Sequence, residues 1–175
     1  FKINDVVDWL IDKDYSVRVV TGIPNYPKGK FYKGYGVFSD KLNEINNNLI
    51  INRLPLIPRG SGSKSMLVLN YISYFISTIF FTFFLILFKK KYDVILVHHT
   101  SPFLISIAPV IYKLFRSSKN ILWDLDIWPE TLIAMKIIKR KSTIRAIDWF
   151  VKRIYRKYDE ILISSPSLKE LISMR

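Results

Sequence analysis

The stretch YDVILVHH, from Tyr92 to His99, decides the fold class of this chain. It is a nearly continuous apolar run, which is typical of a strand that is buried on both faces of a parallel sheet. The sequence predicts a helix after it, over Pro102–Phe115, and then a second apolar strand, NILWDLD, over Asn120–Asp126. Because a strand, a helix and a strand follow one another, this region indicates a parallel βαβ unit.

Strands and helices continue to alternate on both sides of this unit. The other predicted strands cover Ser16–Gly22, Leu49–Leu54 and Tyr158–Ser165, and the other predicted helices cover Phe1–Tyr15, Met66–Phe88, a segment from Pro129, Thr143–Lys157 and a segment from Ser165. This pattern predicts an α/β fold with a Rossmann-like, doubly wound and mainly parallel sheet. Ligands of such sheets bind beyond the carboxyl ends of the strands. Those ends carry TGIPNYP, HHTSP, DLDIWPE and SSPS, which are either parts of a site or ordinary turns.

The composition narrows the class of partner. The 175 residues are enough for one domain with a core, and 27 Lys and Arg against 14 Asp and Glu give a net charge of +13. Such an excess calls for an anionic partner: nucleic acid, anionic lipid or a phosphorylated substrate. The chain has no Cys and only two His, which are adjacent, so no metal site is expected.

The segment Met66–Phe88 contains no charged residue and is followed by Lys89, Lys90 and Lys91. Its length and basic flank meet the criteria for a transmembrane span. A span here would separate TGIPNYP from YDVILVHH and split the predicted sheet. We therefore favour a crossover helix with one face on the sheet and the other against lipid or another domain, and a fully buried helix is the third alternative.

Glycine is concentrated in two early loops. Four of the six glycines lie in TGIPNYPKGKFYKGYG, Thr21–Gly36, and the other two lie in PLIPRGSGSK, Pro55–Lys64. The chain therefore places its freest backbone in these two loops, directly after two predicted strands.

These loops also carry a family resemblance. TGIPNYPKGKFYKGY, RLPLIPRGSGSK followed by LNYISYF, Ser101-Pro102, LDIWPET and RKYDEILISSPSLKEL have the order and spacing of one family. They resemble the N-terminal half of bacterial retaining GT-B glycosyltransferases, in the fucosamine-transferase-like group that builds capsule and O-antigen. The resemblance runs over nearly the whole chain and implies one acceptor-side GT-B domain over residues 1–175.

The resemblance implies an activity and its partners. The expected reaction moves a sugar from a nucleotide sugar, the donor substrate, to a lipid-diphosphate-linked saccharide acceptor, with no bound prosthetic group. The expected location is the cytoplasmic face of the inner membrane, on an anionic membrane surface, as a peripheral or monotopic protein. The family's first strand is expected before Phe1, and its C-terminal glycosyltransferase domain, which binds the donor nucleotide, is not in this sequence. We therefore expect about half an enzyme, inactive alone.

The resemblance also assigns candidate site residues. The substrate-binding candidates are Asn25, Tyr26, Lys28, Arg59, Gly60, Ser61, Gly62, His99, Ser101, Asp124 and Trp128. Tyr26 offers a flat face for a sugar, and Arg59 is suited to bidentate phosphate binding near the Gly60–Gly62 amides. The alternative is that both loops are merely solvated.

The catalytic candidates are Asp126 and Glu130, placed to orient acceptor hydroxyls, because a retaining transfer can use the donor diphosphate as its base. The alternative is that Trp128 and Pro129 pack the start of a helix and Glu130 favours its dipole. We expect Tyr26, Arg59 and Asp126 to converge on one cleft beyond the carboxyl edge of the sheet.

Two other classes of function stay open. A basic nucleic-acid-binding module would explain the charge, but only the first loop interleaves aromatic and basic residues as such a surface requires. We therefore expect no nucleic acid as a partner. A non-catalytic membrane scaffold is the other alternative.

Overall fold

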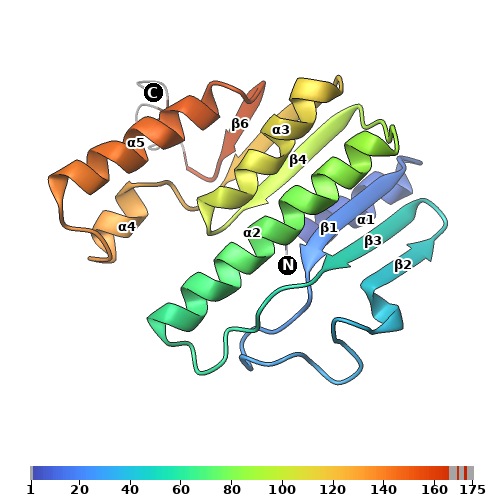
Figure 1. Cartoon of the computed structure of the whole chain (residues 1–175). Helices are drawn as coiled ribbons and strands as arrows, with labels where there is room; N and C mark the ends of the chain where they lie inside the picture. Colours follow the sequence, from blue (N-terminus) through green and yellow to red (C-terminus); the bar gives the residue numbers. More distant parts are fainter. Residues whose placement is uncertain (1, 166–168, 170–171, 173–175) are drawn as a thin grey trace. The chain divides into compact units, whose positions relative to one another are not determined.

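The structure is a computed structural model that describes residues 2–165, Lys169 and Ile172. Figure 1 shows its helices and strands, which belong to two compact units, Phe1–Phe81 (unit 1) and Thr82–Arg175 (unit 2). Each unit contains its own three-stranded sheet. The α/β class predicted from the alternation is confirmed.

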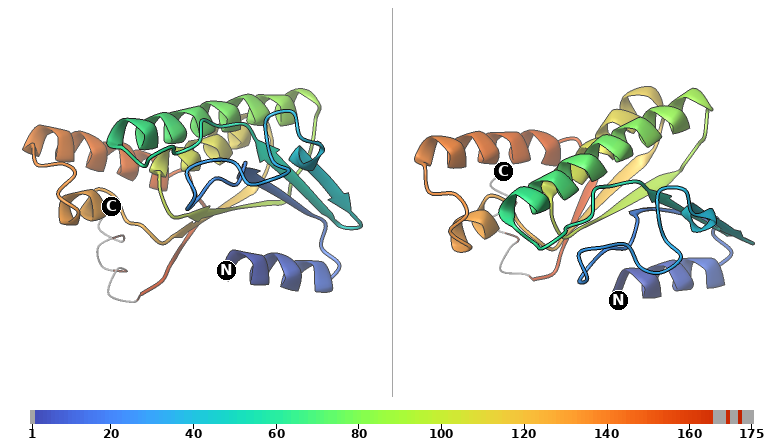
Figure 2. Two further views of the ribbon diagram at one scale, coloured as in Figure 1. Left: turned by 90° about the horizontal axis from the view of Figure 1, so that it is seen from below. Right: turned by 60° about the horizontal axis from the view of Figure 1, so that its bottom comes forward.

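Unit 1 contains α1 (Lys2–Asp12), β1 (Val17–Gly22), the 3-10 helix η1 (Asp40–Leu42), β2 (Asn43–Asn46), β3 (Leu49–Leu54) and most of α2 (Lys64–Leu87). The sheet order is β1-β3-β2. Strands β1 and β3 are parallel, with Val17 opposite Leu49 and Gly22 opposite Leu54, whereas β2 runs antiparallel to β3. Figure 2 shows α1 and α2 on opposite faces of this sheet, so both of its faces are covered.

Unit 2 contains β4 (Val94–His99), the 3-10 helix η2 (Phe103–Ser106), α3 (Ile107–Phe115), β5 (Lys119–Asp124), α4 (Glu130–Ala134), α5 (Lys141–Tyr155) and β6 (Glu160–Ile163). Its sheet has the order β4-β5-β6 and is parallel throughout. Leu96 lies opposite Ile121, and Leu122 lies opposite Ile161. This is the βαβ unit that YDVILVHH predicted.

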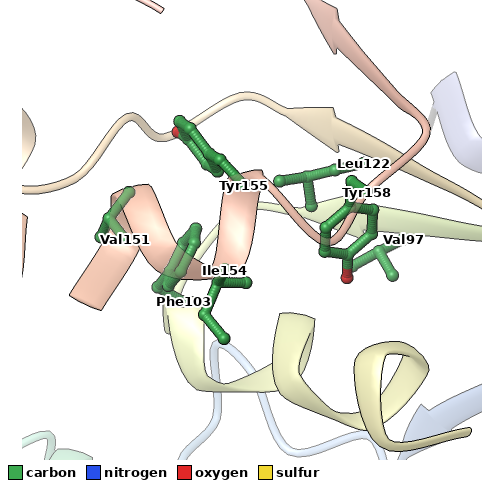
Figure 3. Close-up of a cluster of buried hydrophobic side chains, with 7 residues drawn as sticks. All are labelled: Val97, Phe103, Leu122, Val151, Ile154, Tyr155 and Tyr158. Carbon is green, nitrogen blue, oxygen red and sulfur yellow. The ribbon is translucent and has the colours of Figure 1, made fainter. Parts of the chain in front are cut away.

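The core of unit 2 forms where α5 packs against β4 and β5 (Figure 3). It consists of Val97, Phe103, Leu122, Val151, Ile154, Tyr155 and Tyr158. Phe103, Leu122 and Val151 are completely buried, and burial of each such side chain contributes about 1.5–3 kcal/mol. Tyr158 satisfies its buried hydroxyl by donating to the carbonyl of Ser106. The apolar stripe of the basic helix α5 is thus fixed to the sheet.

The apolar helix α2 carries a polar stripe that faces the loop after β3. Asn70 donates to the carbonyl of Ile57, Ser73 accepts from the Ile57 amide, and Ser77 donates to the carbonyl of Pro55. These three side chains satisfy backbone groups that have no partner in a sheet. The stripe therefore holds the 55–59 loop in place.

The predicted boundaries agree with the structure within a few residues, with two exceptions. The edge strand β2 was not predicted, and Pro129 caps α4 instead of lying in its first turn. The helix predicted from Ser165 falls largely on residues outside those that the structure describes.

Candidate functional site

Two glycines connect the loop after β1 to the loop after β3 by a hydrogen bond between their backbones. The amide of Gly60 donates to the carbonyl of Gly29 at 2.8 Å. Both residues have positive φ, +69° at Gly29 and +56° at Gly60. A Cβ atom on Gly29 would lie 1.8 Å from the Gly60 carbonyl oxygen, closer than any real contact. Glycine is therefore required at position 29, both for its conformation and for this contact.

Asn25 ties the same two loops together by its side chain. Its amide nitrogen donates to the carbonyl of Ile23, and its amide oxygen accepts from the backbone amide of Arg59. Its carbonyl accepts from the amide of Gly29. Asn25 is almost completely buried, so its hydrogen bonds fix the two loops to each other below their surface.

The side chain of Arg59 lies between two aromatic rings. Its guanidinium carbon is 5.1 Å from the ring centre of Tyr26 and 5.5 Å from that of Tyr71. Its Nε donates to the side chain of Asn70 at 3.4 Å. Within the part of the chain that the structure describes, neither terminal nitrogen of Arg59 has a hydrogen-bond partner. The planar group is therefore held in position with its two outer nitrogens available, as bidentate binding of a phosphate requires.

Other cations of unit 1 lie over the tyrosine rings of the first loop. The Nζ of Lys28 is 4.8 Å from the centre of the Tyr32 ring, and Lys41 is 5.3 Å from that of Tyr35. Tyr26 itself is 69% exposed, although one side of its ring faces Arg59. A free aromatic surface thus remains next to the available guanidinium nitrogens.

The Gly60–Gly62 segment is less open than the sequence predicts. The amide of Gly60 donates to Gly29, and the amide of Gly62 donates to the carbonyl of Arg59. Ser61 is exposed, and the hydroxyl of Ser63 accepts from the amide of Met66 in the first turn of α2. The two glycine amides are therefore engaged within the loop and do not point to a ligand.

A second polar cluster lies at the carboxyl ends of β4 and β5 in unit 2. The hydroxyl of Ser101 donates to the carboxylate of Asp126, and the indole nitrogen of Trp128 donates to the same hydroxyl at 3.4 Å. The Trp128 ring stacks on the core residue Phe103, with 6.3 Å between ring centres. Trp128 therefore packs on the core of unit 2 and fixes the hydroxyl of Ser101. Its contact with a substrate stays a prediction.

Behind this cluster lies a buried network of ionisable groups. His99 Nδ1 and the Asp124 carboxylate share a hydrogen bond of 2.7 Å, and Tyr155 donates to the other carboxylate oxygen. His99 and Asp124 are completely buried. Burial acts to raise the pKa of Asp124, but hydrogen bonds from His99, Tyr155 and the Asp126 amide together hold it below its ordinary value. In this structure both residues support the loop and do not reach its surface.

The candidate residues thus fall into two clusters, one in each unit. Tyr26 and Arg59 are in contact in unit 1, and Ser101, Asp126 and Trp128 are in contact in unit 2. Glu130 is half-buried in the first turn of α4. The convergence of Asp126 with Arg59 stays a prediction.

Sequence reasoning missed three residues of these clusters: Asn70, Tyr71 and Tyr155. Asn70 was visible only as part of a thin polar stripe on α2, which is a signal for buried polar contacts. Tyr71 and Tyr155 lie in helices whose apolar pattern already explains an aromatic residue, so nothing in the pattern separated them.

The described residues contain no group of three or more His, Cys, Asp or Glu side chains that would hold a metal ion. Among them, one helix, Lys64–Leu87, is long and apolar enough to cross a membrane. No family model, curated protein or solved structure matches this chain.

Proposed function

We propose that this chain is the acceptor-binding half of a sugar transferase that acts on a saccharide linked to a lipid diphosphate. In this proposal its two units form the N-terminal half of a GT-B fold with a doubly wound sheet. In the same proposal a C-terminal glycosyltransferase domain binds the nucleotide sugar, which is the donor.

The observation that carries the proposal is the position of Arg59. Its guanidinium is fixed by Tyr26, Tyr71 and Asn70, while its outer nitrogens are free to bind two phosphate oxygens. The exposed part of Tyr26 beside it suits the apolar face of the first sugar. A diphosphate followed by a sugar matches this pair of groups better than either ligand alone.

In the same proposal the Asp126 cluster acts on the acceptor hydroxyls. Asp126 is held by Ser101, which Trp128 fixes in turn, so its carboxylate has a defined direction. Such a carboxylate orients a sugar hydroxyl by accepting its hydrogen bond. Asp124 and His99 are positioning residues, because Asp124 accepts from the Asp126 amide.

We place the chain at the cytoplasmic face of an anionic membrane, as a peripheral or monotopic protein. Exposed apolar residues of α2 support this location, among them Ile72, Ile76 and Phe80, and so does the run Lys89–Lys91. An apolar helix face with adjacent lysines binds anionic lipid surfaces.

The test measures binding of a short-chain, water-soluble prenyl-diphosphate monosaccharide to the chain by calorimetry. The comparison ligands are the prenyl monophosphate sugar, the free sugar and a DNA duplex. We expect the diphosphate to bind most tightly and Arg59→Ala to weaken it about tenfold or more, since a hydrogen bond to a charged group contributes about 1.5–3 kcal/mol. Arg145→Ala, which removes an exposed arginine of α5, is the matched control. Tighter binding of the duplex would favour the nucleic-acid class instead.

A further inference from the structure

A hollow of about 420 Å³ lies in unit 2, at the amino-terminal ends of β4 and β5. It is thus at the opposite end of these strands from Ser101 and Asp126. Two segments line it, residues 91–93 before β4 and residues 115–119 between α3 and β5. Its volume falls in the range of small-ligand sites, about 300–1,000 Å³.

The lining is positively charged. It contains Lys91, Arg116 and Lys119 against a single acid, Asp93. Lys119 is partly neutralised, because its Nζ lies 2.5 Å from Glu160. Lys91 and Arg116 have no ion pair within the described residues.

Arg116 is held in this hollow by the end of α2. Its Nη2 donates to the carbonyl of Ile86 at 2.7 Å. Its Nε is buried and has no hydrogen-bond partner among the residues that the structure describes. An arginine with one group anchored and another donor unsatisfied is suited to an anion with several oxygens.

The surroundings of the hollow are apolar and exposed. The last turns of α2 and α3 lie side by side, since Arg116 bonds to Ile86 and the Tyr112 hydroxyl bonds to the carbonyl of Lys90 (Figure 1). The exposed large side chains of these turns include Leu87, Phe88, Leu114 and Phe115, with exposed fractions of 76%, 58%, 71% and 58%. Three consecutive lysines, Lys89–Lys91, follow directly. Apolar and basic side chains are therefore interleaved around one basic hollow.

We infer that the paired ends of α2 and α3 dock on an anionic bilayer and that the hollow takes a lipid headgroup phosphate. Leu114 and Phe115 enter the interface beside Leu87 and Phe88, and Lys91 and Arg116 bind the phosphate. Charge complementarity favours an anionic lipid surface over an apolar protein partner, because such a partner would leave the lysines without a counter-charge. The inference rests on the proposed membrane association and adds α3 and a specific phosphate site to it.

The test is sedimentation of the full chain with phosphatidylcholine vesicles, with and without phosphatidylglycerol. We expect Lys91→Gln and Arg116→Gln each to weaken binding to the anionic vesicles about fivefold. Leu114→Ser combined with Phe115→Ser should weaken it about tenfold. The controls are Lys13→Gln, an exposed lysine after α1, and Phe38→Ser, a completely exposed aromatic residue, and both should bind like the unchanged chain. Circular dichroism checks the fold, and Lys91→Gln serves if Arg116→Gln does not fold.

Several outcomes would overturn the inference. One such outcome is that the chain does not bind vesicles but does bind inorganic phosphate at Lys91 and Arg116, as detected by NMR. The hollow would then be a site for free phosphate. Unchanged vesicle binding by the Leu114 and Phe115 variants, with weaker binding by Ile76→Ser, would confine the contact to the middle of α2. That result would leave membrane association intact. Binding of the prenyl-diphosphate sugar is measured separately on the same variants, so failure of the proposed function is recognised independently.

Discussion

The guanidinium of Arg59 and the ring of Tyr71 lie 5.5 Å apart, and Tyr26 covers the group at 5.1 Å. Tyr71 belongs to α2, whereas Tyr26 and Arg59 belong to the two loops, so Arg59 connects three segments of unit 1. A guanidinium between two rings loses fewer orientations on binding an anion than a free arginine does.

This contact predicts coupling between Arg59 and Tyr71. Arg59→Gln and Tyr71→Leu should each weaken binding of the prenyl-diphosphate sugar. The binding free energy lost by the double variant should be smaller than the sum of the losses of the two single variants. We expect a coupling energy of about 0.5–2 kcal/mol, measured by calorimetry in a double-mutant cycle. Tyr35→Leu, whose ring faces Lys41, is the control and should add to Arg59→Gln without coupling. Strict additivity at position 71 would show that the ring does not position the guanidinium.

The glycine contact predicts a difference between two alanine substitutions. Gly29→Ala should lower the free energy of unfolding by more than about 1–2 kcal/mol, because alanine is disfavoured at positive φ and its Cβ meets the Gly60 carbonyl. Gly36→Ala meets no atom within 4 Å and should be neutral or stabilise by up to about 1 kcal/mol. Chemical denaturation measures both. Equal effects of the two substitutions would contradict the close contact.

The Asp124 network predicts a pH dependence of stability. Since hydrogen bonds hold the pKa of Asp124 below its ordinary value, its ionised form stabilises the folded state above that ordinary value, about 3.9. This stabilisation is lost as the pH falls through the lower pKa of the folded state. Tyr155→Phe should therefore lower the free energy of unfolding by about 1.5–3 kcal/mol at neutral pH, the usual contribution of one hydrogen bond to a charged group, and by less near pH 2.

Tyr158→Phe is the control for this prediction. It also removes a buried hydroxyl, but one that donates to a carbonyl, which does not titrate. Its loss of stability should be the same at both pH values in denaturant titrations. A constant loss for Tyr155→Phe as well would mean that Asp124 does not carry the pH dependence.

The Ser101–Asp126 contact predicts an effect on transfer in an enzyme assembled from this chain and a nucleotide-binding half. Asp126→Asn should lower kcat/KM for the acceptor about tenfold or more, because it weakens a charged hydrogen bond to the sugar. Ser101→Ala should lower it less, since it only frees the carboxylate to turn. The KM for the nucleotide sugar should not change, and Asp8→Asn on α1 should have no effect. Full activity of Asp126→Asn would leave DLDIWPE as a structural helix start.

Much of the fold follows from apolar pattern alone. Strands β3 and β4 were predicted within two residues, because their apolar runs leave no other place for them. The strand β2 was missed because NEIN has one apolar residue, Ile45, and this side chain is 76% exposed. It is an edge strand held by its ladder to β3 and by the hydrogen bond from Asn52 to Asn43, neither of which has a pattern in the sequence.

The candidate site could be predicted only in part. Tyr26 and Arg59 were predicted as site residues from the family resemblance and from their place in glycine-rich loops after strands, and the structure brings them into contact. The sequence could not indicate that the side chain of Asn25 would hydrogen-bond to the other loop, at the Arg59 amide, or that His99 would be buried against Asp124. Such partners depend on which side chains meet across long separations, 25 residues in the case of His99 and Asp124.

The pairing of Gly29 with Gly60 also limits how this surface can evolve. A contact between backbone atoms cannot be adjusted by changing side chains, and a side chain at position 29 would collide with Gly60. Position 29 therefore has to stay glycine, whereas the neighbouring exposed positions can vary. Exposed positions of the two loops such as Tyr26, Lys28 and Ser61 can therefore change while the backbone contact that joins the loops is kept. A library that randomises these three positions and fixes both glycines should, for the same reason, yield mostly folded variants with altered loop surfaces.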